Sequence, residues 1–400
     1  MNKIPVVVLL LSVFGYTIIA MLALMTGIDN QFASILYRFF IVLLSFGIIL
    51  TFGLSVLESK REVSTYFFLF LLLSFFFFFS FRALLDSFIR ASEIDSSALT
   101  MFWMFLIGVT FLPTMAASIG WKSFSAHSTF LCSFGTLIGL VAVLITLFVW
   151  GYQNGFDTLI GGRIEFDTLN PISMGHVGAS LLIFACAYHQ TTKSSFIYKS
   201  SILLLSVAAG AVLIVAAGSR GPIVSIVSVI IFAVAFSPKF SFYGKLGFLA
   251  VVIFLLVVVV SLYSDAMIVS RVTTGLFEDP ARIKIFIDSL EILKNNPLVG
   301  GGIMNMDTYP HNFILESFVV LGFFGGIVYL LINVLALYAS IQVYKKKISF
   351  VVPMLFIQYF VAGLFSGTIH EAAVFWMTLA ILFLLFYTNF RSVSVRFVRQ

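Results

Sequence analysis

The sequence predicts an all-α polytopic membrane protein, a single integral membrane domain of residues 1–400 with about twelve transmembrane helices. The first observation is composition: 61% of the residues are hydrophobic and 10% are charged, which leaves too little polar surface to cover a water-soluble core. The second is a series of apolar stretches, each roughly 20 residues long. The third is an uneven distribution of lysine and arginine between those stretches.

The predicted spans follow from the apolar stretches, which are long enough to cross a bilayer. In chain order they lie near residues 5–26, 36–57, 66–82, 98–118, 129–150, 172–189, 200–217, 222–236, 246–263, 313–336, 349–366 and 372–389. We interpret the first as a membrane helix and not a removed signal peptide, because it is longer than a signal h-region and lacks a clear cleavage site. Both cysteines lie in apolar stretches, which indicates neither a disulfide framework nor a zinc site.

The basic residues predict the orientation of the chain. With the N-terminus inside, the inner loops hold fourteen lysines and arginines and only Glu58 and Glu62 as acidic residues. This bias places both termini in the cytoplasm. The outer side then carries two long segments, at about 151–171 and 264–312. The second is a large outer loop between the ninth and tenth spans, and it is the longest polar stretch in the protein.

Within this loop, the stretch "DPARIKIFIDSLEILKNNP" predicts an amphipathic helix of about fourteen residues. Asp279 can cap it, Pro280 suits the first helical position and Pro297 closes the segment. Apolar residues recur at helical spacing, with charged residues opposite. The segment is too short and too charged to cross a bilayer, so we expect it along the membrane surface or packed on the spans.

An isolated arginine lies between the seventh and eighth spans, in the stretch "GSRGP". Arg220 is costly at membrane depth unless it snorkels, pairs or binds an anion. Gly218 and Gly221 free the backbone for a tight turn, and the turn also offers the Ser219 hydroxyl and a helix N-terminus. Two interpretations stand: a phosphate-binding site, or a positively charged turn that anchors a hairpin among lipid headgroups.

Three further arginines lie on the predicted outer side: Arg163, Arg271 and Arg282. Each alone is a typical structural or headgroup contact. Gathered around an outer cavity they would suit a diphosphate, because guanidinium groups bind phosphate oxygens bidentately.

The loop enters the tenth span at His311 and Asn312, and Gly322 and Gly325 follow nine residues later. One interpretation is an interfacial histidine followed by small residues for close helix packing. The other is a site for proton transfer, in which an imidazole acts as a base and Asn312 orients it or holds a sugar hydroxyl.

His-Asn, nine residues and then glycine-x-x-glycine at an outer loop–helix junction resembles the signature of the O-antigen ligase and O-antigen polymerase superfamily. The "GSRGP" turn resembles the arginine turn of the same proteins. "NPISMG" at 170–175 and "NNPLVGGG" at 295–302 resemble other recurrent segments. The resemblance covers about residues 160–330, together with the twelve-span layout.

The resemblance implies a GT-C-like fold in the bacterial inner membrane and a role in lipopolysaccharide biosynthesis. The implied enzyme is a glycosyltransferase without metal or other cofactor, which acts at the periplasmic face on a glycan donor linked to undecaprenyl diphosphate. Arg220 and Arg282 would hold the diphosphate, with Arg163 or Arg271 in support, and His311 would act as base. Further candidate participants are Asp279, Asp307, Glu316, His370 and Glu371.

Three functions remain open at this point. Phenylalanine-rich composition and the form of the arginine turn favour an O-antigen polymerase, with an O-antigen ligase that uses lipid A–core as acceptor as the alternative. A lipid-linked glycan flippase also fits twelve spans, although the halves of the chain do not resemble each other. Expected partners are the lipid-linked donor, the glycan acceptor, membrane lipids and, by family analogy, a chain-length regulator. Nothing indicates nucleic-acid binding.

Overall fold

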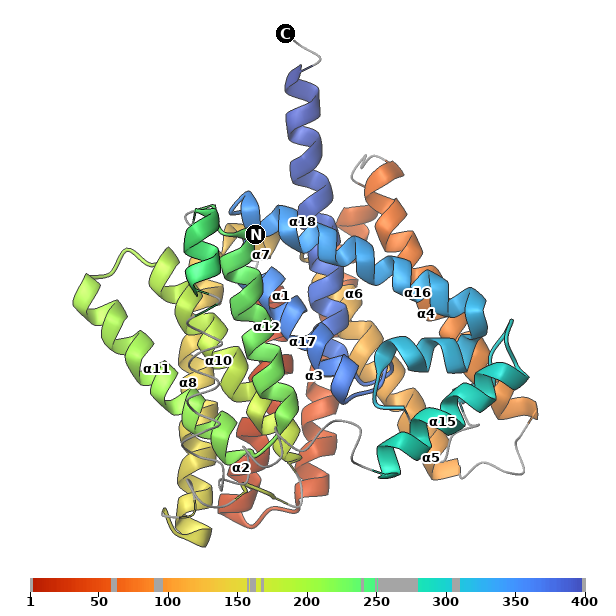
Figure 1. Cartoon of the computed structure of the whole chain (residues 1–400), viewed down its shortest axis with the longest axis horizontal. Coiled ribbons are helices and arrows are strands. Elements are labelled where there is room, and N and C mark those ends of the chain that lie inside the picture. Colours follow the sequence, from red (N-terminus) through yellow and green to blue (C-terminus); the bar gives the residue numbers. More distant parts are fainter. Residues whose placement is uncertain are drawn as a thin grey trace.

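The protein is a helical membrane protein, seen in a computed structural model (Figure 1). The structure describes residues 3–58, 63–89, 96–156, 158, 163–166, 169–238, 241–248, 250, 280–303 and 310–397. Within this part of the chain, eight helices are long and apolar enough to cross a membrane, and three shorter apolar helices accompany them. The ninth predicted span, 246–263, falls largely outside the described residues. The polytopic architecture is confirmed, whereas twelve spans and a GT-C-like arrangement remain predictions.

The first half of the chain forms five long apolar segments. The first is continuous but carries a π-helical turn, η1, in its middle; η2 interrupts the fourth in the same way. The elements are α1 (Ile4–Leu10), η1 (Leu11–Gly15), α2 (Tyr16–Thr26), α3 (Asn30–Glu58), α4 (Val63–Ile89), α5 (Ser96–Trp103), η2 (Met104–Phe111), α6 (Leu112–Ile119), α7 (Lys122–Ala126) and α8 (Ser128–Asn154).

The second half holds the helices that position the predicted site. They are α10 (Pro171–Thr191), α11 (Phe196–Ala216), α12 (Arg220–Phe236), α15 (Pro280–Asn295), α16 (Phe313–Lys345), α17 (Val351–Phe365) and α18 (Ala373–Phe397). Helix α12 packs on α10 and α17, and α16 packs on α4, α17 and α18. The buried aromatic centre contains Trp376 of α18, with Phe75 and Phe76 of α4 and Tyr329 of α16 around it.

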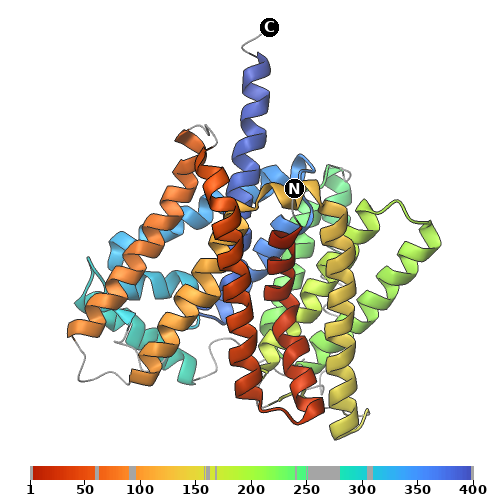
Figure 2. The same ribbon diagram turned by 180° about the vertical axis from the view of Figure 1, so that it is seen from behind.

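Both chain ends lie at the same end of the molecule, at the top of Figures 1 and 2. An even number of crossings would give this arrangement. Which end faces the cytoplasm is a prediction from the basic residues alone.

The predicted amphipathic helix is α15, and it is slightly longer than expected, with 16 residues. It lies crosswise to its neighbours, away from the chain ends (Figure 1), and packs on α16. Phe286, Ile287 and Leu290 are exposed on it. An exposed apolar face on a short charged helix suits a position along the membrane surface.

Candidate functional site

The "GSRGP" turn lies where α11 meets α12. Gly218 has a φ of 58°, in the left-handed region that glycine adopts without strain, and Ser219 is the N-cap residue of α12. Arg220 is therefore the first residue of that helix, two residues earlier than the span predicted from the sequence. Its backbone belongs to the first turn of a helix, where N–H groups without an intrahelical acceptor favour an anion.

A second predicted arginine lies directly against this turn. The backbone N–H of Ile164 donates to the carbonyl of Ala216 at 2.8 Å. A Cβ atom on Gly218 would lie 3.3 Å from Cγ of Arg163, so the glycine leaves room for the arginine side chain. Arg163 also lies 3.9 Å from the Glu165 carboxylate. The structure thus brings Arg163 and the turn that carries Arg220 together, although they are far apart in sequence.

The start of α10, which is the "NPISMG" segment, forms the opposite side of the turn. Asn170 caps α10 by accepting the N–H of Ile172 at 2.9 Å. A Cβ on Gly175 would lie 2.5 Å from the Pro222 ring, so only glycine permits this close approach of α10 and α12. The imidazole of His176, one residue later, lies beside Gly221, where a Cβ would be 3.8 Å from Nε2.

His311 and Asn312 form the junction before α16. Asn312 caps the helix by accepting the N–H of Leu315 at 3.0 Å, and its amide donates to the carbonyl of Leu364, near the end of α17, at 3.1 Å. His311 is half-buried and has a φ of 51°, unusual for a residue with a side chain. Asn312 therefore has a structural role at this junction that the sequence did not reveal.

Arg282 and His311 act on each other electrostatically. Partial burial lowers the pKa of the His311 imidazole from its ordinary value, and the positive charge of Arg282 lowers it further. Arg282 itself is exposed in the first turn of α15, as predicted. The loop therefore places a cation close enough to His311 to favour the neutral form, which is the form that accepts a proton.

The tenth span is not one continuous helix, contrary to the prediction from its apolar pattern. Gly322 has φ 67° and ψ −170°, which breaks α16 in its N-terminal third. The "NNPLVGGG" segment fills the break: Phe323 donates its N–H to the Pro297 carbonyl at 2.7 Å, and Gly301 donates to the Val319 carbonyl at 2.8 Å. The role of Gly322 is thus to break the helix and admit this loop, whereas close helix packing was the simpler expectation.

Two side chains that the sequence analysis missed hold the same loop from α4. Arg82 donates to the Gly300 carbonyl at 3.2 Å and lies 3.4 Å from Asp86. The Asp86 carboxylate accepts the N–H of Ile303 at 2.6 Å. Charged residues at the end of an apolar span were the available signal.

The α17–α18 loop, residues 366–372, is held in place by hydrogen bonds to Glu316 of α16. This carboxylate is 4% exposed and accepts the N–H of Ile369 through both oxygens, at 3.0 and 3.2 Å. Thr110 donates to the backbone carbonyl of His370 at 2.6 Å, and the His370 ring packs on Phe102. Glu316 and the backbone of His370 therefore fix the α17–α18 loop. Glu371, the next residue of this loop, lines a cavity.

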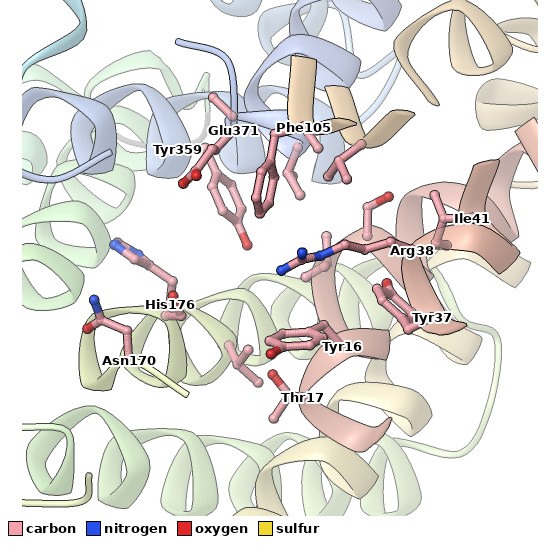
Figure 3. A pocket seen from close by; sticks show the side chains of 18 of the residues that line it. Tyr16, Thr17, Tyr37, Arg38, Ile41, Phe105, Asn170, His176, Tyr359 and Glu371 are labelled. Carbon is pink, nitrogen blue, oxygen red and sulfur yellow. The ribbon is translucent and has the colours of Figure 1, made fainter. Parts of the chain in front are cut away.

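That cavity has a volume of about 450 Å³ and is lined by residues of η1, α2, α3, η2, α10 and α17, and by the start of α18 with the residues just before it. Figure 3 shows Arg38 of α3 and Tyr359 of α17 reaching into it, with Asn170 and His176 on its α10 wall. The Arg38 guanidinium lies over the Phe105 ring, 4.3 Å from its centroid. None of the α3 lining was predicted, although an arginine inside an apolar span was a signal for it.

The remaining predicted site residues are outside the described part of the chain: Arg271, Asp279 and Asp307. Within the described residues, no three histidine, cysteine, aspartate or glutamate side chains form a group suited to a metal ion. The predicted absence of a metal from the reaction stays a prediction.

The segment from within α11 to the middle of α16 contains the arginine turn, the α15 helix, the glycine-rich loop and the His-Asn junction. A protein-family model described as O-antigen ligase matches this segment, at residues 204–330. Residues 204–330 are therefore similar to the O-antigen ligase family. This match supports the predicted assignment to the O-antigen polymerase and ligase superfamily, whose members transfer glycans in lipopolysaccharide synthesis. It covers less than half of the chain, and Arg163, Arg38 and the α10 wall lie outside it.

No curated protein and no solved structure matches the chain. The roles of the individual residues therefore rest on their geometry and chemistry.

Proposed function

We propose that this protein transfers a glycan from undecaprenyl diphosphate to a sugar hydroxyl at the periplasmic face of the bacterial inner membrane. The observation that carries the proposal is the electrostatic effect of Arg282, at the start of α15, on His311, before α16: the positive charge lowers the pKa of the imidazole and favours its neutral form. The similarity of residues 204–330 to the O-antigen ligase family supports the substrate class, a lipid-linked glycan at a membrane.

In this mechanism His311 accepts the proton of the acceptor hydroxyl. The hydroxyl oxygen then forms a bond to the anomeric carbon of the donor, while the bond from that carbon to the diphosphate oxygen breaks. The bonding electron pair leaves with the diphosphate. Arg220, Arg282 and the supporting Arg163 stabilise the negative charge that grows on this leaving group.

The arginine turn is suited to the diphosphate. Arg220 begins α12, so its guanidinium and the first backbone N–H groups of the helix favour an anion in the same place. Ser219 adds a hydroxyl at the N-cap, and Gly218 lets Arg163 approach. Arg271 belongs to the same proposal, as a predicted supporting residue from the periplasmic loop.

We favour a polymerase, in which the acceptor is the next lipid-linked repeat unit, because the phenylalanine-rich composition and the "GSRGP" turn resemble that branch. A ligase is the second candidate, since the matching family model is described as O-antigen ligase. The two differ in the acceptor and share the donor site. A chain-length regulator is an expected partner of a polymerase only.

The test is glycan display in a strain without its own copy of the protein. Lipopolysaccharide ladders are compared with the pool of carrier-linked glycan after complementation with wild type, His311→Ala or Arg220→Ala. Core with a single repeat unit identifies a polymerase, and bare core with long carrier-linked glycans identifies a ligase. Full complementation by both variants, at normal membrane levels, contradicts the proposed site and favours the flippase alternative.

A further inference from the structure

The cavity between α3, α10 and α17 contains chemistry that the transfer mechanism above does not use. Its polar lining includes two opposite charges, Arg38 and Glu371, together with hydroxyl and amide side chains. It also includes aromatic rings from α2, α3, η2 and α17: Tyr16, Tyr37, Phe105 and Tyr359. Its volume of about 450 Å³ is in the range of pockets that hold a small ligand.

One polar group in the wall is buried without a partner. His176 is 7% exposed, and within the described residues neither of its ring nitrogens makes a hydrogen bond. Its backbone is well fixed, because its carbonyl accepts the side-chain amide of Gln358 at 3.0 Å. A buried polar group without a hydrogen bond costs free energy, so a ligand that bonds to this ring would recover that cost.

The charges in the cavity balance each other. Partial burial raises the pKa of the Glu371 carboxyl, and the Arg38 guanidinium opposes that shift. The guanidinium also lies over Phe105. A phosphate in this cavity would meet the Glu371 carboxylate, whereas an acyl chain would leave the guanidinium and the His176 nitrogens without hydrogen bonds.

A sugar ring can contact both the aromatic and the polar side chains that line the cavity. Its C–H face packs on aromatic rings, and its rim of hydroxyl groups both donates and accepts hydrogen bonds. Guanidinium, carboxylate and amide groups are planar and can bond to two neighbouring hydroxyls at once. The cavity offers one of each, on Arg38, Glu371 and Asn170, around the open space seen in Figure 3.

The position of the cavity relates it to the transfer site. The first turns of α10 form its wall, and the same turns pack against α12 at the arginine turn. His176 belongs to both, because it lines the cavity and lies beside Gly221. A ligand in the cavity is thus one side chain away from the helix that begins with Arg220.

We propose that this cavity binds a pyranose unit of the transferred or accepting glycan, with Arg38, Glu371 and His176 as its polar contacts. The inference rests on the proposed function for the identity of the glycan. The site itself depends on residues outside the O-antigen ligase match, since Arg38, His176 and Glu371 all lie beyond residues 204–330.

The experiment uses the full chain with photoreactive benzoylphenylalanine at Phe105, which lines the cavity, and at Phe40 as the matched control. Phe40 lies on α3 two residues after Arg38, and its side chain is 52% exposed on the surface of the protein. Cells that make the glycan are irradiated, and sugar attached to the purified protein is detected by periodate oxidation and hydrazide labelling. We expect a sugar-bearing adduct at position 105 and none at position 40. Equal labelling at both positions, or a phospholipid adduct alone at position 105, would overturn the proposal.

Competition on the purified protein in nanodiscs distinguishes the sources of the sugar. Free repeat-unit oligosaccharide can act only as acceptor, and a carrier-linked repeat with its acceptor hydroxyl methylated can act only as donor. Suppression of the adduct by either one supports the sugar site and identifies its source. Suppression by sugar-free undecaprenyl diphosphate alone would assign the cavity to the carrier and overturn the proposal.

Arg38→Ala should weaken oligosaccharide competition on the order of tenfold, through the loss of charged hydrogen bonds. Unchanged competition, in a variant that retains its thermal stability, would contradict the assigned contact. Failure of the complementation test alone leaves the adduct at position 105 intact, so the site and the proposed function fail independently.

Discussion

The buried carboxylate of Glu316 in α16 accepts the backbone N–H of Ile369 through both of its oxygens. This bond ties the helix that follows the His-Asn junction to the loop between α17 and α18. Asn312 makes a second tie to the same region, through the carbonyl of Leu364. The His311 junction is thus held from two directions by side-chain hydrogen bonds to α17 and to the loop that follows it.

Glu316→Ala should destabilise the protein, because the buried Ile369 N–H would lose its acceptor. Leaving such a group unpaired costs about 1–3 kcal/mol. Glu316→Gln keeps an acceptor oxygen and should lose much less. The measurement is the thermal midpoint of the detergent-solubilised protein for both variants. Equal midpoints for Ala and Gln would show that the hydrogen bond to Ile369 has no part in stability.

Gly322→Ala should disrupt the break in α16. The backbone there has a φ of 67°, and an added Cβ would meet the backbone of the loop that fills the break, at Leu298 and Gly300. We expect a low yield of folded protein, or a lower thermal midpoint and lost glycan transfer together. Gly47→Ala is the matched control, since Gly47 lies in α3 with no atom within 4 Å of its added Cβ. A helical alanine at that position should be neutral or stabilising.

The helices were predictable because each depends on its own apolar residues. The predicted span 172–189 agrees with α10 (Pro171–Thr191), and 222–236 agrees with α12 within two residues at its start. The break at Gly322 was not predictable, because the apolar pattern continues through it. The break depends on hydrogen bonds from a separate loop. The apolar pattern of one segment contains no information about a loop that bonds to it.

In the candidate site, too, features within one segment were predictable and features that depend on packing between segments were not. Arg220, Arg282 and His311 could be proposed from the sequence because each belongs to a short pattern within one segment. The cavity was missed because Arg38 and Glu371 are separated by most of the chain and line one cavity only in the folded protein, where α3 and α18 both pack on η2. A charged residue in a predicted span shows that a partner is needed, and the fold decides which one.

Asp86 should stabilise the glycine-rich loop more than Arg82 does. Asp86 accepts the Ile303 N–H at 2.6 Å and also pairs with Arg82. Asp86→Ala removes both interactions, while Arg82→Met removes the ion pair and the bond to the Gly300 carbonyl but keeps the contact to Ile303. Limited proteolysis of the folded protein should therefore cut the 296–303 segment fastest in Asp86→Ala. Identical cleavage rates in the two variants and wild type would contradict this anchoring role.

The pH dependence of glycan transfer should report the charge of Arg282. Burial and Arg282 both lower the pKa of His311, so the imidazole stays neutral and able to accept a proton down to a lower pH. Activity then falls only as the pH drops through this lowered pKa. Arg282→Gln removes the positive charge, which raises the pKa of His311 and moves the acidic limb of the rate profile to higher pH.

Arg282→Lys separates charge from shape in this experiment. Lysine keeps the positive charge near His311, so the acidic limb should stay close to its wild-type position even if the maximum rate falls through a poorer diphosphate contact. The rate is measured on carrier-linked repeat units with purified protein across the acidic range. A limb that moves equally in the Gln and Lys variants, or in neither, would mean that the Arg282 charge does not act on the base.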